Sequence, residues 1–115
     1  MESGIDILVA HNHPIVRLGA KLHLESLGHK IVYEASDWEQ TLLGSKKTNP
    51  KLVMIDYSLQ NIRAAFFNGA FSTLSRERSI LVYSDVNIAS NITHAISLGI
   101  KGYVSQSQPL TDLTE

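Results

Sequence analysis

The sequence contains no cysteine, which excludes disulfides, thiolate metal sites and cysteine nucleophiles. It also lacks a long basic run: ten Lys and Arg stand against eleven Asp and Glu, so charge indicates neither a nucleic-acid nor a membrane surface. The N-terminus has neither the basic start nor the apolar length of a signal peptide. No apolar run is long enough to span a membrane. These absences together favour a cytoplasmic protein.

What remains is an ordinary globular composition. The chain has 115 residues, of which 43% are hydrophobic and 18% charged, a balance that a disordered chain does not have. This length predicts one domain with a single core. The sequence has no long linker, no low-complexity tract and no internal repeat beyond the β–α unit described next.

Short apolar runs alternate with amphipathic stretches along the chain. The apolar runs predict five strands, at Ile5–Ala10, Ile31–Ala35, Leu52–Ile55, Ile80–Tyr83 and Lys101–Ser105. Strands that are apolar throughout are typical of parallel sheets with both faces covered. Five β–α units with right-handed crossovers therefore predict a doubly wound α/β fold.

The helices between these strands begin and end at recognisable residues. Pro14 suits the first turn of the first helix and Gly28 its end, while Ser36 or Asp37 caps the second. The third helix is predicted over Ile62–Leu74 and the fourth over Asn87–Leu98. The predicted inner faces hold Ile15, Val16, Leu18, Leu22, Leu24 and Leu27; Trp38, Leu42 and Leu43; Phe66, Phe67 and Phe71; and Ile88, Ile92, Ala95 and Ile96.

The tail after the fifth strand resembles the start of a helix, with Pro109 in its first turn. The sequence stops before such a helix can cover the sheet. We therefore expect the last helix to be missing or truncated. The chain is then a fragment of a longer protein, or its end is disordered.

Polar residues follow the predicted strands at the edge where parallel α/β sheets bind ligands. His11, Asn12 and His13 come after the first strand, and they include no acid. Asp56 comes after the third strand, where it is either a nucleophile or cation ligand or simply a turn residue. The remaining polar residues at this edge are Ser84 and Asp85 after the fourth strand and Ser105 and Gln106 after the fifth.

Four segments, in order, resemble the receiver domains of response regulators: V-A-H-N-H-P-I-V-R-L-G, L-V-M-I-D-Y-S-L, L-V-Y-S and K-G-Y-V-S-Q. The first segment is similar to the NarL/LuxR-type subgroup, in which a helix-turn-helix DNA-binding domain follows the receiver. The resemblance implies a flavodoxin-like (CheY-like) five-stranded parallel sheet in the order 2-1-3-4-5. It makes residues 1–115 the receiver domain and places the DNA-binding domain outside this chain.

The resemblance also implies roles for single residues. Asp56 takes the phosphoacceptor position, Ser84 the hydroxyl that contacts the phosphoryl group, and Tyr103 the aromatic switch position. Implied partners are a second copy of the chain or another regulatory protein, and a histidine kinase. They would meet the face of the fourth helix, fifth strand and fifth helix, or that of the first and fifth helices. DNA is implied only through the absent domain, and a membrane is not.

Three positions depart from the family pattern. His11 and Asn12 replace the acidic pair, and Gln106 replaces a lysine. Phosphoryl transfer to a carboxylate needs a divalent cation to offset charge. Only Asp56, the Asn12 side-chain oxygen and the Ser58 carbonyl remain as Mg²⁺ ligands, while the phosphate loses its ammonium partner. We therefore predict an atypical receiver, not an enzyme, with no cofactor or with weakly bound Mg²⁺.

Three alternatives stay open from the sequence. One is a working receiver that a histidine kinase phosphorylates at Asp56. Another is a transition-metal site formed by His11, His13 and Asp56, since imidazole and carboxylate suit zinc. The third is a phosphatase-like enzyme with Asp56 as its nucleophile. Ser58 argues against it, because such an enzyme needs an acid two residues after the nucleophile.

Overall fold

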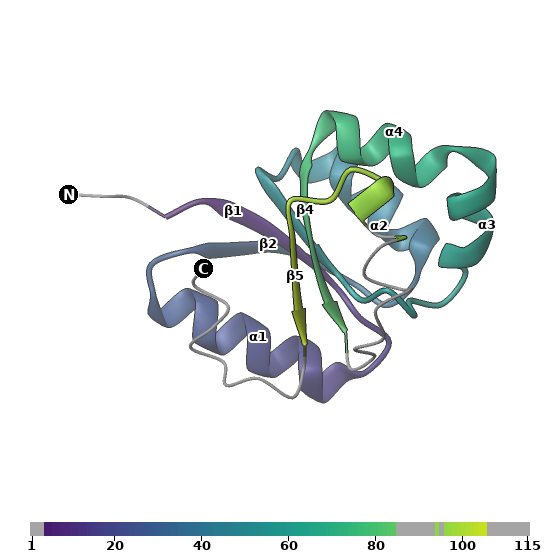
Figure 1. Ribbon diagram of the computed structural model, residues 1–115. Coiled ribbons are helices and arrows are strands. Elements are labelled where there is room, and N and C mark those ends of the chain that lie inside the picture. Colours follow the sequence, from purple (N-terminus) through teal and green to yellow (C-terminus); the bar gives the residue numbers. More distant parts are fainter. Residues whose placement is uncertain (1–3, 85–93, 95, 106–115) are drawn as a thin grey trace.

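The structure is a computed structural model that describes residues 4–84, 94 and 96–105, with the backbone alone at 84 and 103–105. Five parallel strands form one sheet in the order β2-β1-β3-β4-β5 (Figure 1), which confirms the predicted flavodoxin-like arrangement. The strands are β1 (Asp6–Ala10), β2 (Lys30–Ala35), β3 (Leu52–Ile55), β4 (Ser79–Ser84) and β5 (Gly102–Ser105). The helices are α1 (Pro14–Ser26), α2 (Trp38–Thr48), α3 (Ile62–Asn68) and α4 (Ala70–Glu77).

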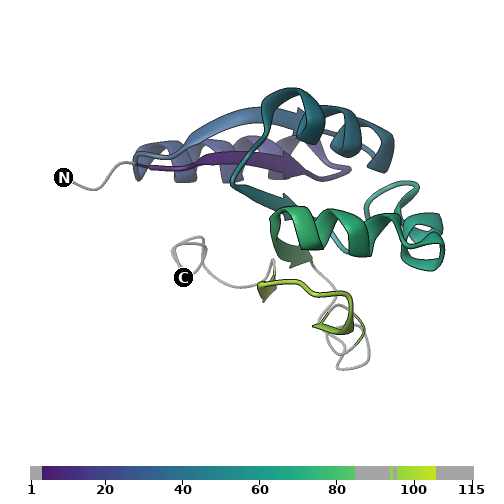
Figure 2. The ribbon, with the colours of Figure 1, turned by 90° about the horizontal axis from the view of Figure 1, so that it is seen from above.

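Helices cover both faces of the sheet. In Figure 1, α1 lies on one face and α2, α3 and α4 on the other; Figure 2 shows the strands following one another from β2 to β5. Alternate residues of β1 serve the two layers: Leu8 packs in the core under α2 to α4, whereas Ile7 and Val9 pack in the core with Leu24 of α1. The central strands β1 and β3 are thus buried on both sides, as their apolar sequences predict, whereas the edge strand β2 is only half-buried over most of its length.

The second helix shows how the sequence fixes its own boundaries. The Asp37 carboxylate accepts the backbone N–H of Gln40 at 2.8 Å, and the Gln40 side chain accepts the N–H of Ser36 at 2.8 Å. These reciprocal bonds satisfy amides that the first turn leaves unpaired. Asn49, in the left-handed region at φ 51°, ends the helix just before Pro50.

The prediction of one helix over Ile62–Leu74 is wrong. Gly69 has a φ of +85° and separates α3 from α4. A left-handed residue cannot continue a right-handed helix, and glycine takes this conformation without a Cβ clash. Because the chain restarts at Ala70, Phe71 is buried, Phe66 is half-buried, and Phe67 is 80% exposed rather than on the inner face.

The inner face of α1 is narrower than predicted. Val16, Ala20 and Leu24 face the sheet at a spacing of four residues. Ile15 and Leu22 are exposed by 77% and 58%, because they belong to a second apolar row on the other side of the helix. The further inward predictions that prove exposed are Leu18, Leu27, Leu43 and Ile96.

Several predictions fall outside the described residues. These are the start of the Asn87–Leu98 helix with Ile88, Ile92 and Ala95, the missing or truncated last helix, and Gln106. In the described part of the chain, no helix combines the length and the apolar character that crossing a membrane requires.

Candidate functional site

The loops after β1 and β3 meet at the carboxyl edge of the sheet, as the parallel topology requires. Ala10 pairs with Ile55, so the next residues, His11 and Asp56, emerge side by side. The backbone continues this register, since the Asp56 N–H donates to the Ala10 carbonyl at 3.0 Å. The sequence prediction that these strand ends converge is therefore confirmed.

His11 and Asp56 form a buried pair. Nε2 of His11 lies 3.3 Å from Oδ2 of Asp56, and the two side chains are only 3% and 5% exposed. Nδ1 of His11 accepts the backbone N–H of His13 at 3.0 Å. Because an accepting imidazole nitrogen carries no proton, the ring proton sits on Nε2 and points toward Asp56. The imidazole thus offers the carboxylate a hydrogen-bond donor.

The second oxygen of the Asp56 carboxylate is also occupied. Oδ1 accepts the backbone N–H of Ser58 at 3.1 Å. Both carboxylate oxygens therefore face donors from the protein itself, one from the imidazole and one from the backbone two residues on. This arrangement is an Asx-type turn closed from the other side by a buried histidine.

Asn12 fastens the β1 loop to the loop that follows Asp56. Its Nδ2 donates to the Ser58 carbonyl at 3.0 Å, and its Oδ1 accepts the Gln60 N–H at 2.8 Å. One side-chain amide thus holds two backbone groups of the same loop. An aspartate at this position has no N–H to donate, so the bond to Ser58 is specific to the amide.

Arg17 contributes to this site, although no sequence pattern selected it. Its guanidinium donates to the His11 carbonyl at 2.6 Å, and its Nε lies 3.7 Å from a Glu34 carboxylate oxygen. Lys21 lies 3.6 Å from the other Glu34 oxygen. The only sequence signal for the contact between Arg17 and His11 is that Arg17 lies six residues after His11, one turn into α1. The cation helps to orient the backbone that carries the imidazole.

The residues around Asp56 do not fit a magnesium site. Mg²⁺ requires oxygen ligands in a near-octahedral shell, usually with one or two carboxylates. In the two loops that meet here, after β1 and after β3, Asp56 is the one carboxylate among the described residues. An N–H faces each of its oxygens, and the Asn12 oxygen already accepts from the backbone. Across the described ranges, no group of three or more His, Cys, Asp or Glu side chains is placed to hold a metal. The zinc alternative built on His11, His13 and Asp56 is therefore not supported.

Three other predicted site residues lie on the neighbouring strands or beyond them. Ser84 is the last residue of β4, and Tyr103 lies in β5 paired with Val82. Their backbones lie in the two strands that follow β3 in the sheet, at or near its carboxyl edge. Gln106 lies outside the described residues. The roles of these three residues stay predictions.

His94, which falls within the predicted Asn87–Leu98 helix, contacts the loop that follows β3. It is half-buried, and its Nδ1 lies 2.5 Å from the Tyr57 hydroxyl in a shared hydrogen bond. Burial raises the pKa of Tyr57, an effect that the nearby Arg63 partly offsets. Since 37 residues separate the partners, no local sequence pattern indicates this contact.

Comparison with known proteins gives a consistent result. No protein-family model matches the chain. A curated protein of Pseudomonas aeruginosa, a transcriptional regulator by name, is 27% identical over 107 residues, which are 93% of this chain and 52% of that protein. The chain therefore spans about half the length of this relative.

Response regulators are among the solved structures with the same fold. A two-component response regulator of the LuxR family from Aurantimonas matches with a TM-score of 0.83 and 26% identity, over 97% of this chain and 81% of that one. The isolated receiver domain of RcsB from Salmonella enterica, in the presence of a phosphomimetic, matches with a TM-score of 0.85 and 22% identity, over 97% and 84%.

Proposed function

We propose, from the receiver fold that this chain shares with response regulators of the LuxR family, that it is the receiver domain of a transcription regulator that works without phosphorylation. The proposed activity is regulatory rather than enzymatic and is located in the cytoplasm. DNA binding belongs to a second domain outside this chain, which agrees with the length of the Pseudomonas relative.

The observation that carries this proposal is the buried contact between His11 and Asp56. To accept a phosphoryl group, a carboxylate oxygen must be free to attack and a cation must offset the growing negative charge. In this chain an imidazole N–H occupies the space beside Oδ2, and a backbone N–H holds Oδ1. A neutral donor cannot replace the charge of Mg²⁺, so Asp56 serves here as a structural acceptor.

The loop after Asp56 supports the same reading. Asn12 uses both ends of its amide to hold Ser58 and Gln60, so this loop is fixed without a phosphoryl group or a cation. A receiver normally exchanges between two states. A ligand changes the populations of these states only if it binds the two with different affinity. With the loop fixed in this way, partner binding rather than phosphorylation selects the state.

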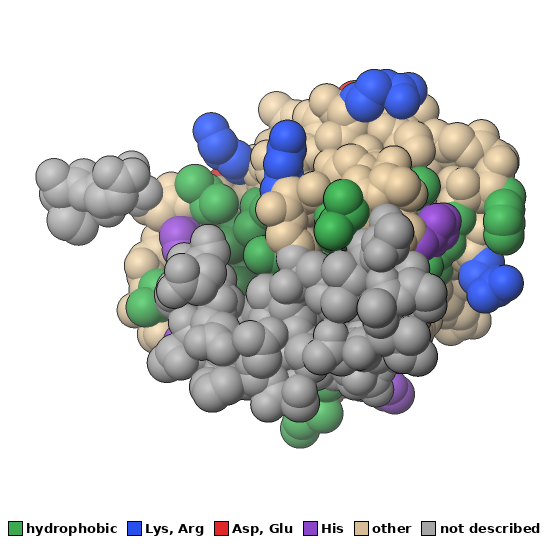
Figure 3. All heavy atoms as spheres, in the orientation of Figure 1, with side chains coloured by type: hydrophobic (Ala, Val, Ile, Leu, Met, Phe, Trp, Pro, Cys, Tyr) green, Lys and Arg blue, Asp and Glu red, His purple; other side chains and the backbone are tan. Residues whose placement is uncertain are grey.

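A partner surface is available on α1. Ile15, Leu18 and Leu22 are exposed and lie on one side of the helix, at a spacing of three and four residues. Hydrophobic side chains protrude beneath α1 at the lower edge of Figure 3. Exposed apolar side chains that share one side of a helix are typical of protein contact sites. A second copy of the chain is the proposed partner, through the surface formed by these three residues.

Incubation with acetyl phosphate and Mg²⁺, followed by intact-mass spectrometry, tests the proposal. The expected result is no phosphoryl adduct on the wild-type chain. A double variant, His11→Asp with Asn12→Asp, restores two carboxylates and is the positive control, because it should gain a Mg²⁺-dependent adduct. An adduct on the wild type that disappears in Asp56→Ala would instead establish a working phosphoacceptor, the target of a histidine kinase.

A further inference from the structure

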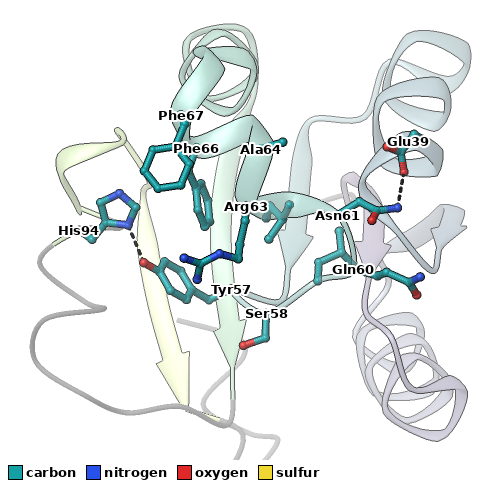
Figure 4. A pocket seen from close by; sticks show the side chains of 12 residues that line it. Glu39, Tyr57, Ser58, Gln60, Asn61, Arg63, Ala64, Phe66, Phe67 and His94 are labelled. Atoms are coloured by element: carbon teal, nitrogen blue, oxygen red, sulfur yellow. Dashed lines mark hydrogen bonds between the residues drawn. The ribbon is translucent and has the colours of Figure 1, made fainter.

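A cavity of about 860 Å³ lies beside the loop that follows Asp56. Figure 4 shows residues of this loop and of α3 around it, with His94 on the far side. Sites for small organic ligands in proteins typically measure about 300–1,000 Å³. The cavity is therefore large enough for a compact organic molecule.

One wall of the cavity is aromatic and fixed in place. The Tyr57 and Phe66 rings stack with centroids 5.2 Å apart, and the His94 ring meets Phe66 edge-on at 5.2 Å. The hydrogen bond between Tyr57 and His94 ties this wall together. Phe67, which also lines the cavity, is 80% exposed. These rings offer a planar ligand flat apolar surfaces with little further ordering.

Arg63 supplies a cation on the same side of the cavity. Its guanidinium extends toward Tyr57 in Figure 4. The ion pairs among the described residues involve His11, Arg17 and Lys21, and Arg63 has no carboxylate partner there. The acid that lines the cavity, Glu39, lies beyond Asn61 and accepts a hydrogen bond from the Asn61 Nδ2 at 2.9 Å. An exposed guanidinium without a partner suits a carboxylate, which it binds through two parallel hydrogen bonds.

The cavity shares a loop with the His11–Asp56 site. Ser58 and Gln60 line the cavity, and both are held through their backbones by Asn12. A molecule that packs against this loop therefore contacts the segment that closes over Asp56. Such contact gives a bound ligand a direct physical route to the centre of the receiver.

We propose that this cavity binds a small aromatic carboxylate, with its ring against the wall formed by Tyr57 and Phe66 and beside Phe67, and its carboxylate on Arg63. Binding of this ligand stabilises one arrangement of the loop after Asp56 and so supplies an input that phosphorylation does not. The regulatory role of this ligand rests on the proposed function, whereas binding of the ligand in the cavity does not.

Titration of the ¹⁵N-labelled chain with cinnamate, followed by amide chemical shifts, tests the binding. Cinnamamide is the matched neutral probe, Arg63→Gln the test variant and Arg76→Gln, an exposed arginine on α4, the matched control. We expect shifts in the loop after Asp56 and in α3. Affinity should be about tenfold weaker for cinnamamide and for Arg63→Gln, and unchanged for Arg76→Gln.

Two outcomes would overturn the proposal: no shifts with cinnamate, or equal affinity for the neutral probe and for Arg63→Gln. Phe67→Ser, a change at an exposed side chain, gives a second check, because it removes ring contact without touching the core. The phosphorylation assay contains no cinnamate and reads a separate property. A phosphoryl adduct on the wild type refutes phosphate independence and leaves the cavity proposal intact. The absence of cinnamate shifts refutes the cavity proposal and leaves phosphate independence intact.

Discussion

His11 combines three interactions at the end of β1. Nε2 faces Asp56, Nδ1 accepts the His13 N–H, and the carbonyl accepts from Arg17. A buried imidazole is costly unless its nitrogens find partners. Here each named partner comes from a different local feature, namely the β3 loop, the start of α1 and its second turn. The histidine therefore organises the site whether or not any ligand binds there.

His11→Ala should lower the free energy of unfolding by about 1–3 kcal/mol, because it leaves the Asp56 carboxylate buried without its imidazole partner. Urea unfolding followed by circular dichroism measures this loss. His13→Ala is the control, since it keeps the backbone N–H that His11 accepts and removes only an exposed side chain, whose ring lies 5.3 Å from the His11 ring. That variant should stay within about 0.5 kcal/mol of the wild type. Equal losses in the two variants would contradict the role assigned to the His11 ring.

Tyr83 gives a pH-dependent prediction. Burial raises the pKa of this phenol above its ordinary value of 10.0, since the interior disfavours the phenolate. The unfolded chain then loses the Tyr83 proton at a lower pH than the folded chain does. The stability that this group contributes is present below pH 10.0 and is lost as pH rises through the folded pKa.

Urea unfolding at several pH values from about 8 to about 11 measures this effect. The wild type should lose more stability over this range than Tyr83→Phe, which has no phenol to ionise. Each protein is compared with its own value at the lowest pH, so a general effect of the substitution cancels. Parallel losses in the two proteins would show that Tyr83 does not contribute.

The sequence predicted which residues meet at the site better than it predicted their contacts. The strand ends placed His11, Asn12 and Asp56 at one edge, and the structure confirms this position. The pattern could not show that Asn12 reaches Ser58, because 46 residues separate them and the contact depends on the exact path of two loops. Periodicity identifies faces and edges of elements, but side-chain partners across loops depend on tertiary packing.

At the scale of elements, the strands were predicted more accurately than the helix faces. The β3 strand has the predicted bounds, since Leu52–Ile55 is apolar throughout and bounded by polar residues. The α1 prediction failed on Ile15, Leu18 and Leu22, because a helix with two apolar rows gives no signal for which row faces the sheet. The break at Gly69 was missed because an isolated glycine is tolerated within many helices.

Gly44 and Gly19 form a matched pair for testing helix packing. A Cβ at Gly44 of α2 would lie 2.2 Å from the Tyr33 ring, whereas a Cβ at Gly19 of α1 meets nothing within 4 Å. Gly44→Ala should therefore cost about 1–3 kcal/mol of stability, since Tyr33 must move out of its place against α2. Gly19→Ala should add about 0.5–1 kcal/mol through helix propensity. Thermal unfolding of both variants measures the difference, and a stabilised Gly44→Ala would contradict the packing of α2 on β2.

At the scale of the whole molecule, the doubly wound sheet separates the edge that holds His11 and Asp56 from the face that carries the proposed partner surface. The loops that carry His11 and Asp56 lie at the carboxyl edge, beside the cavity lined by Arg63. The α1 surface of Ile15, Leu18 and Leu22 starts immediately after the first of these loops. Because Pro14 opens the helix directly after His13, no linker separates the β1 loop from this surface.

Self-association through α1 is the last prediction. The surface of Ile15, Leu18 and Leu22 should bring two copies of the chain together, because burying exposed aliphatic side chains against each other removes apolar area from water. Sedimentation equilibrium of the wild type should show a dimer that dissociates on dilution. Ile15→Glu with Leu22→Glu should give a monomer with an unchanged melting temperature, since neither side chain packs in the core. Leu43→Glu, at a 60% exposed leucine on the opposite helix layer, is the control and should leave the dimer intact. A wild type that remains monomeric at high concentration, or a Leu43→Glu variant that dissociates equally, would remove α1 as the contact surface.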